Sequence, residues 1–325
     1  MGNDVRLAVA GVGNNVSALL QGIEHYRHTF GELPLVGVTH PRLSGIGVDE
    51  IQCVAAFDID PTKVGRSLAE AIHQGFNNFP RIVDAIGEPA VVEHGIRDDE
   101  VRQTDVDHVV QHLRRTRSEV LLISLPTSRP AAALSYAEAA LSAGVAVVNC
   151  SADPVVRVPD LLRRFSSASL PLLGDDLASQ FGSSLVHREL LDLLSRRGLR
   201  VDGTYQVNLG GNEDFRNLRD SGEPKLASKL NVLSSVPGVA SLSVIPSGGH
   251  VPFLGDRKVA HISIEGRGWA GSRVVVELRL DVQDSSNAAG VIIDLVRMAA
   301  DGRRRGVGGF HEDAIPLLKS PPTRR

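Results

Sequence analysis

The sequence predicts an α/β fold in which a doubly wound parallel sheet is joined to a second α+β unit with an open antiparallel sheet. Over residues 7–173, short apolar runs alternate with amphipathic runs, which is the pattern of parallel strands connected by helices. From residue 203 onward, strands with alternating apolar and polar residues follow, as in a sheet with one solvated face. We therefore expect one domain over residues 1–200, completed by residues 287–325, and a second over residues 201–286.

The elements of the first unit follow from these periodicities. Residues 75–107 show no pattern that assigns them. The expected strands cover residues 7–10, 51–58, 119–125, 145–150 and 170–173, and the expected helices cover residues 16–23, 62–74, 109–115, 130–143 and 158–166.

The second unit is expected to begin after a connecting helix over residues 185–197. Its strands are expected over residues 204–209, 241–245, 259–265 and 273–282. A last helix over residues 288–301 has one strongly apolar stripe, so we expect it to pack on the first unit.

A glycine turn follows the first strand. Gly11 and Gly13 stand between that strand and the first helix, with Asn14 and Asn15 at the helix start. Such a turn directs backbone amides and a helix N-terminus at one point, which suits a pyrophosphate. Because Val16 occupies the position of the third glycine in the dinucleotide-binding fingerprint, an ordinary tight turn remains the alternative.

Asp58 ends the second strand. An acid at this position would hold a ribose 2′-hydroxyl and repel a 2′-phosphate, which favours NAD over NADP. At the next strand end, Thr127 and Ser128 are expected at the carboxyl edge of the sheet, where ligands bind in doubly wound folds.

Bulk composition excludes several classes of partner. The net charge of -3 gives no indication of nucleic-acid binding. The sequence has no apolar run long enough to cross a membrane and no signal-peptide pattern, so we expect a cytoplasmic protein.

Cys53 and Cys150 are expected to pack in strands rather than form a disulfide. The histidines are expected to be surface or capping residues, and no metal site is predicted.

Lysine is rare in this chain. Only five of the 35 basic residues are lysines. Where arginine supplies most of the charge, the remaining lysines are candidates for roles that need an amine able to titrate. Lys225 and Lys229 are four residues apart and would share a helix face, whereas Lys63 lies outside every motif and is expected at the surface.

The segment GDDLASQFGSS precedes the connecting helix. Its polar residues Asp176, Ser179 and Ser183 could simply cap that helix. Alternatively, Ser179, Gln180, Gly182 and Ser183 could hold a phosphate with backbone and hydroxyl donors.

Eight blocks in order make the sequence resemble the inositol-phosphate synthases, most nearly their actinobacterial type. The resemblance covers nearly the whole chain and is carried by GVGNN (11–15), AAFDID (55–60), GDD with SQ and G (174–182), NLGGNEDFRN (208–217), KLASK (225–229), DRK (256–258), DSSNAAGVIID (284–294) and LKSPP (318–322).

This resemblance implies an NAD-binding Rossmann domain, a second domain for catalysis and tetramerisation, and a homotetramer. It also implies the reaction. Bound NAD oxidises C5 of an open-chain hexose 6-phosphate, C6 loses a proton, and C6 closes on the carbonyl carbon in an aldol step. The same cofactor then reduces C5, so the reaction has no net redox change.

The resemblance also implies the roles of individual residues. The amines would stabilise oxyanions and move protons, because each step places negative charge on an oxygen. The implied catalytic residues are Lys225, Lys258, Lys319 and Asp284. The implied substrate-binding residues are Lys229, Ser179, Gln180, Ser183, Asn208, Asp214 and Asp256. The implied cofactor-binding residues are Gly11, Gly13, Asn14, Asn15, Asp58, Ser124, Thr127, Asn149 and Asp176.

One departure keeps the substrate open. The family has a lysine two places after the acid pair, where this chain has Ala178. Glucose 6-phosphate giving 1L-myo-inositol 1-phosphate is the first expectation. The alternative is fructose 6-phosphate giving a five-membered cyclitol phosphate in secondary metabolism. A simple NAD-dependent dehydrogenase would not need the lysines, and a non-catalytic NAD sensor would lack them.

Overall fold

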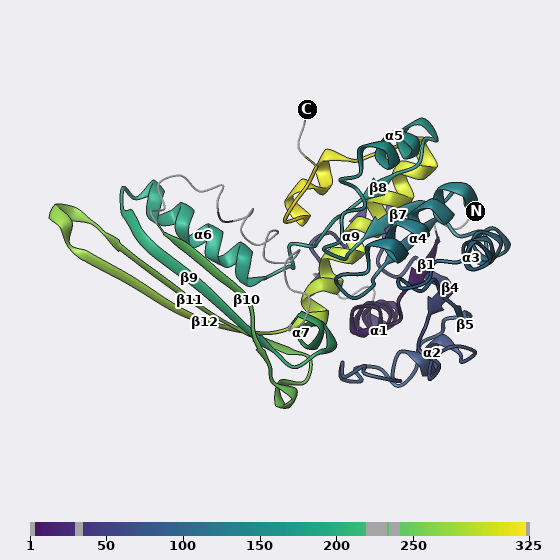
Figure 1. Ribbon diagram of the computed structural model, residues 1–325, viewed down its shortest axis with the longest axis horizontal. Coiled ribbons are helices and arrows are strands. Elements are labelled where there is room, and N and C mark those ends of the chain that lie inside the picture. Colours follow the sequence, from purple (N-terminus) through teal and green to yellow (C-terminus); the bar gives the residue numbers. More distant parts are fainter. Residues whose placement is uncertain (1–3, 30–34, 219–232, 234–240, 323–325) are drawn as a thin grey trace.

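The computed structural model describes residues 4–29, 35–218, 233 and 241–322, and it contains two principal sheets (Figure 1). The predicted Lys225 and Lys229 lie outside the described residues. Among the described helices, none is long and apolar enough to cross a membrane.

The first sheet is entirely parallel, with strand order β5-β4-β1-β6-β7-β8. Its strands are almost wholly buried, which explains why they appear in the sequence as continuous apolar runs. They are β1 (Val5–Ala10), β4 (Ile51–Asp58), β5 (Val92–His94), β6 (Val120–Ile123), β7 (Ala146–Asn149) and β8 (Leu172–Leu173).

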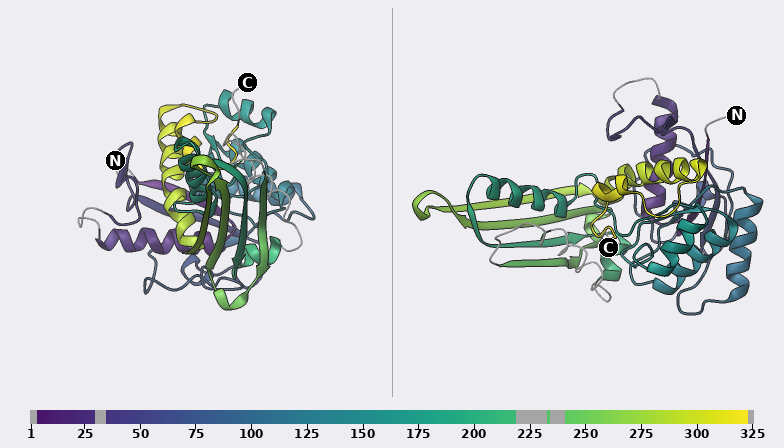
Figure 2. Two further views of the ribbon diagram at one scale, coloured as in Figure 1. Left: turned by 90° about the vertical axis from the view of Figure 1, so that its left-hand side faces the viewer. Right: turned by 90° about the horizontal axis from the view of Figure 1, so that it is seen from above.

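Helices cover both faces of this sheet, as the doubly wound fold requires. One face packs on α1 (Asn14–Thr29) and α9 (Asp284–Arg305), and the other packs on α3 (Gln103–Arg115), α4 (Pro130–Ala143) and α5 (Pro159–Ser167). Figure 2 shows α9, coloured yellow, lying against the first sheet although it follows the second sheet in sequence. The expected return of the last helix is confirmed.

The predicted helix over residues 62–74 is wrong. Only α2 (Leu68–Ala71) forms there. Gly65 has a φ of 83°, and residues 65 and 66 exchange backbone hydrogen bonds with Val92 at the edge of β5. The backbone groups that would continue a helix are therefore used to extend the sheet edge.

The second sheet has the order β10-β9-β11-β12. Its strands are β9 (Arg200–Gly210), β10 (Leu242–His250), β11 (Arg257–Arg267) and β12 (Arg273–Gln283), and α6 (Ser183–Arg196) lies along one face (Figure 1). Three strands pair antiparallel as expected, but β10 pairs parallel to β9. The long connection after β9, which includes α7 (Glu213–Leu218), returns the chain to the same end of the sheet.

Short elements complete the described fold. They are the hairpin of β2 (Arg42–Leu43) and β3 (Ile46–Gly47) and the 3-10 helices η1 (Pro252–Leu254), η2 (Trp269–Gly271) and η3 (Glu312–Leu317).

Candidate active site

The turn between β1 and α1 is tightly packed on one side and open on the other. Gly11 has a φ of 88°, and its amide donates to the carbonyl of Phe57 at 2.8 Å. A Cβ atom on Gly11 would lie 2.5 Å from the carbonyl oxygen of Ser124, whereas a Cβ on Gly13 would meet nothing within 4 Å. The open side at Gly13 leaves room for a ligand to approach the N-terminus of α1.

Asp58 lies at the tip of β4 and directs its carboxylate at this turn. Its Oδ2 accepts a hydrogen bond from the amide of Val12 at 2.7 Å, and its Oδ1 accepts from the amides of Ile59 and Asp60 at 2.8 and 2.9 Å. The carboxylate therefore braces the glycine turn, a role that the sequence did not indicate. Its contact with a ribose stays a prediction.

Lys63 corrects a sequence expectation, because it is buried rather than on the surface. Its Nζ donates to the carbonyl of Val12 at 2.9 Å and lies 3.8 Å from Oδ2 of Asp58. Asn77 supports the same carbonyl through its Nδ2 at 3.0 Å. Sequence reasoning missed both residues, since neither belongs to a motif.

Asn14, the first residue of α1, connects the glycine turn to the second unit. Its Nδ2 donates to Oδ1 of Asp256 at 3.1 Å and to Oδ1 of Asn78 at 2.6 Å, while its Oδ1 accepts from the amides of Asn78 and Phe79. The Asn14 side chain is thus engaged within the protein. Asn15 follows it on the first turn of α1.

Asp256 precedes β11 and is almost fully buried. Besides Asn14, it accepts hydrogen bonds from the backbone amide of Ser285 at 3.1 Å and from the Ser285 hydroxyl. Burial raises the pKa of Asp256 to about 6, and the nearby charge of Asp284 contributes to the increase. Asp256 therefore joins the N-termini of α1 and α9, a function that we did not predict.

Lys258 forms an ion pair with Asp284 at the start of α9. The Lys258 Nζ lies 3.0 Å from Oδ1 of Asp284 and 5.7 Å from the ring centroid of Phe215. Asn212 donates to the other carboxylate oxygen at 3.2 Å. Both charged side chains are only about one-sixth exposed, at 15% and 16%. The amine is thus held in a fixed position with partial access to solvent.

Lys319 forms a second such pair in the C-terminal segment. Its Nζ lies 2.8 Å from Oδ1 of Asp176, and its amide donates to the Asp176 carbonyl at 3.0 Å. The neighbouring amide of Ala178 donates to the carbonyl of Leu317 at 2.9 Å. Ala178, the position that departs from the family, therefore lies beside this ion pair.

The other expected cofactor residues are at the carboxyl edge of the first sheet. Ser124 follows β6, and the hydroxyl of Thr127 lies 3.5 Å from Oδ1 of Asp214 in α7. Asn149, at the end of β7, is fully buried and donates to Oδ1 of Asp175 at 2.7 Å. The side-chain amide of Asn149 is therefore hydrogen-bonded within the protein.

The expected substrate residues around α6 lie in separate surroundings. The Ser183 hydroxyl donates to Oδ1 of Asn208 at 3.0 Å, and both side chains are buried. Gly182, rather than a polar side chain, caps α6. Gln180 donates to the carbonyl of Gly37 at 2.9 Å, and Ser179 is partly exposed. The Gln180 and Ser183 side chains thus contact different partners within the protein, and the substrate contacts of these residues stay predictions.

Two histidines have the spacing of metal ligands, although we expected surface or capping histidines and predicted no metal site. His108 and His112 are four residues apart on α3, and Glu93 of β5 lies beside them. This cluster is on the α3 face of the first sheet, away from the α1 turn, and does not belong to the site above.

Several known proteins are similar to this chain over nearly its whole length. The family model of myo-inositol-1-phosphate synthase matches residues 182–285. Inositol-3-phosphate synthase of Mycolicibacterium smegmatis is 37% identical over 98% of this chain and 93% of the relative. The enzyme of the same name from Corynebacterium glutamicum is 38% identical over the same shares, 98% and 93%. The crystal structure of Ari2 has 50% identity and a TM-score of 0.90, covering 98% of this chain and 93% of its own. This chain belongs to the inositol-3-phosphate synthase family.

Proposed function

We propose that the protein is an NAD-dependent cyclitol phosphate synthase that converts glucose 6-phosphate into 1L-myo-inositol 1-phosphate without net redox change. The observation that carries this proposal is the connection between the Lys258–Asp284 ion pair and the glycine turn. Asp256, two residues before Lys258, accepts from Asn14 at the start of α1. A fixed amine therefore lies close to the part of the fold that suits a dinucleotide.

The residues of the turn fit NAD. The space at Gly13 and the N-terminus of α1 would receive the pyrophosphate, and Asp58 stands where a ribose hydroxyl would reach it. When bound, NAD supplies the chemistry of taking a hydride from C5 and returning it. Lys63 would keep the turn in shape by holding the Val12 carbonyl.

The amines would act on the sugar. Lys258, oriented by Asp284, would stabilise negative charge on a sugar oxygen and supply or accept its proton. Lys319, in the C-terminal segment, would also stabilise negative charge on a sugar oxygen and move its proton. Its ion pair with Asp176 fixes its position. Each carboxylate prevents its amine from swinging into solvent, so the charge is in place before the substrate changes.

Because of Ala178, we keep fructose 6-phosphate as a second candidate substrate. Replacement of a family lysine beside the Asp176–Lys319 pair removes a positive charge from this part of the site. A substrate whose carbonyl is at C2 would place its oxygen differently, and closure of C6 on C2 would give a five-membered ring. The same redox cycle would serve both reactions.

Separate incubations with glucose 6-phosphate and fructose 6-phosphate would test the function. The product is identified by mass and NMR, and free NADH is followed by absorbance. A six-membered cyclitol phosphate from glucose 6-phosphate without NADH accumulation is the expected result. A five-membered product from fructose 6-phosphate would establish the second candidate. Stoichiometric NADH release with an uncyclised product would contradict both and indicate a simple dehydrogenase.

The second sheet supports assembly into a homotetramer. Its face opposite α6 carries exposed apolar side chains from three strands, namely Tyr205, Ile245 and Val275. Burial of such a broad face between copies would remove this apolar surface from water. Light scattering of the purified protein would measure the mass of the assembly, and a stable monomer would contradict it.

A further inference from the structure

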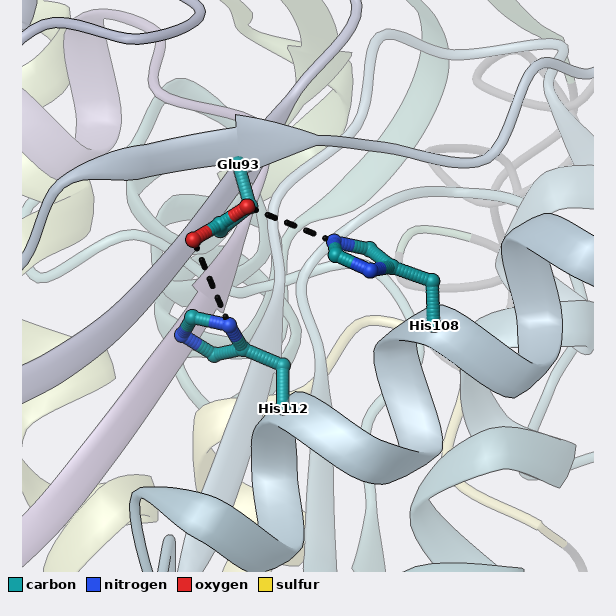
Figure 3. Close-up of side chains that lie close together, drawn as sticks. All are labelled: Glu93, His108 and His112. Atoms are coloured by element: carbon teal, nitrogen blue, oxygen red, sulfur yellow. Dashed lines mark ion pairs between the residues drawn. The ribbon is translucent and has the colours of Figure 1, made fainter.

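Three potential metal ligands meet between β5 and α3, outside the candidate active site (Figure 3). Nε2 of His108 lies 3.4 Å from Oε2 of Glu93, and Nδ1 of His112 lies 3.5 Å from Oε1. One ligand atom from each residue lies within 4.8 Å of the other two. Figure 3 shows both imidazole rings pointing toward the carboxylate.

The separations suit a small tetrahedral ion. Zinc binds imidazole nitrogen and carboxylate oxygen at about 2.1 Å, so the edge of its ligand tetrahedron is about 3.4 Å. Histidines at positions i and i+4 share one face of a helix and can bind one ion together. Two histidines and one carboxylate leave a fourth position for water, which this ion accepts readily.

The two histidines differ in their exposure to solvent. The side chain of His112 is 8% exposed, and its ring packs edge-on against Phe57 with centroids 5.4 Å apart. His108 is 43% exposed and lines an open pocket of about 340 Å³ together with Asp105. An ion could therefore enter from solvent on the His108 side.

Arg115 is the competing group. Its Nη2 donates to Nδ1 of His112 at 2.7 Å and lies 3.6 Å from Oε1 of Glu93. The guanidinium thus blocks Nδ1 of His112, which is one of the proposed ligand atoms, and it adds positive charge at the cluster. Because the Arg115 side chain is 70% exposed, it can turn into solvent when an ion binds. Its removal should make metal binding tighter.

We propose that Glu93, His108 and His112 form a binding site for a zinc-class divalent transition metal that fastens the edge strand β5 to α3. β5 is the outermost strand of the first sheet and has only three residues. Glu93 pairs with Phe57, whose ring lies in the core beneath α3 and α4. The site is therefore on the sheet face opposite α1 and α9, and none of its three residues belongs to the candidate active site.

The test is titration of the untagged full-length protein with Co²⁺ and Zn²⁺, followed by visible absorption and calorimetry. We expect one ion per chain, bound through a tetrahedral centre. His108→Gln is the principal variant, since His108 is partly exposed and its loss should not unfold the protein. Glu93→Gln removes the carboxylate. Affinity should fall in each by more than the roughly 10–100-fold that loss of a group supporting a ligand causes, while Arg115→Ala should bind more tightly.

His28→Gln is the matched control, because His28 is an exposed helix histidine 3.1 Å from Glu24 and, within the part of the chain that the structure describes, belongs to no metal-ligand cluster. It should bind the ion like the unaltered protein. Equal affinity of the unaltered protein and His108→Gln, or no binding at millimolar Co²⁺, would overturn the proposal. Cyclisation by His108→Gln should be unchanged, so this outcome and a failure of the proposed function can be told apart.

Discussion

Lys63 contributes to the glycine turn through one buried amine. Lys63→Met keeps most of the apolar stem but removes the donor to the Val12 carbonyl and the positive charge near Asp58. We expect NAD affinity to fall, together with a loss of about 1–3 kcal/mol in the free energy of unfolding. NAD titration and urea unfolding measure the two effects.

Arg66→Met, three residues along the same loop, is the control for this change. Arg66 is exposed and its side chain donates to the Thr62 carbonyl at 2.7 Å, away from the Val12 carbonyl, so NAD binding should be retained. If Lys63→Met bound NAD as tightly as Arg66→Met, the Lys63 amine would have no part in shaping the turn.

Asp256 gives a pH dependence of stability. Its pKa is about 6 in the fold, above its ordinary value of 3.8, so the folded protein retains a proton that the unfolded chain has lost between these values. The stabilisation is fully present below about pH 4 and is lost as the pH rises through 6. Over that window the protein should lose about 3 kcal/mol relative to Asp256→Asn. Urea unfolding at a series of pH values measures this difference, and a constant difference would contradict the raised pKa.

The residues of this region divide into those that the sequence could indicate and those that it could not. The position of Asp58 at the tip of β4 was predictable, because an acid at the end of an apolar strand is a local pattern. Asn77, Asn78 and Ser285 were missed, since their contacts depend on segments that are far apart in the chain. Lys63 was misplaced for the same reason.

At the scale of elements, substitution of the two glycines of the β1–α1 turn should have different effects. Stability should fall at Gly11, and NAD affinity should fall at Gly13. Gly11→Ala would place a Cβ 2.5 Å from the Ser124 carbonyl at a φ of 88°, so we expect destabilisation of about 1–3 kcal/mol. Gly13→Ala has free space around its Cβ and should fold normally, but it should bind NAD more weakly. Thermal unfolding and NAD titration of both variants distinguish steric packing from ligand approach.

The elements also explain where prediction succeeded. The ends of α4 were predictable because Pro130 begins the helix and Gly144, with a φ of 75°, ends it. The expected helix over residues 62–74 does not form, because Gly65 and the pairing with β5 decide the structure there. Likewise, alternation indicated β10 but not its direction, which the connection after β9 determines.

At the scale of the whole molecule, the candidate site depends on distant parts of the chain meeting. Lys319 reaches Asp176 only because the C-terminal segment returns to the first unit, and Lys258 reaches the α1 turn through Asp256. The family resemblance named the lysines together with Asp284 and Asp176, but it did not establish which acid forms an ion pair with which lysine. Two ion pairs at the junction of the two sheets follow from the fold as a whole.

Glucose 6-phosphate carrying deuterium at C5 provides the most direct test of the hydride cycle. If NAD takes the hydride and returns it to the same carbon, the cyclitol phosphate should retain the deuterium, and no deuterated NADH should accumulate. NMR and mass spectrometry of the product measure this retention. Loss of the deuterium from the ring, or its recovery in free NADH, would contradict the proposed reaction.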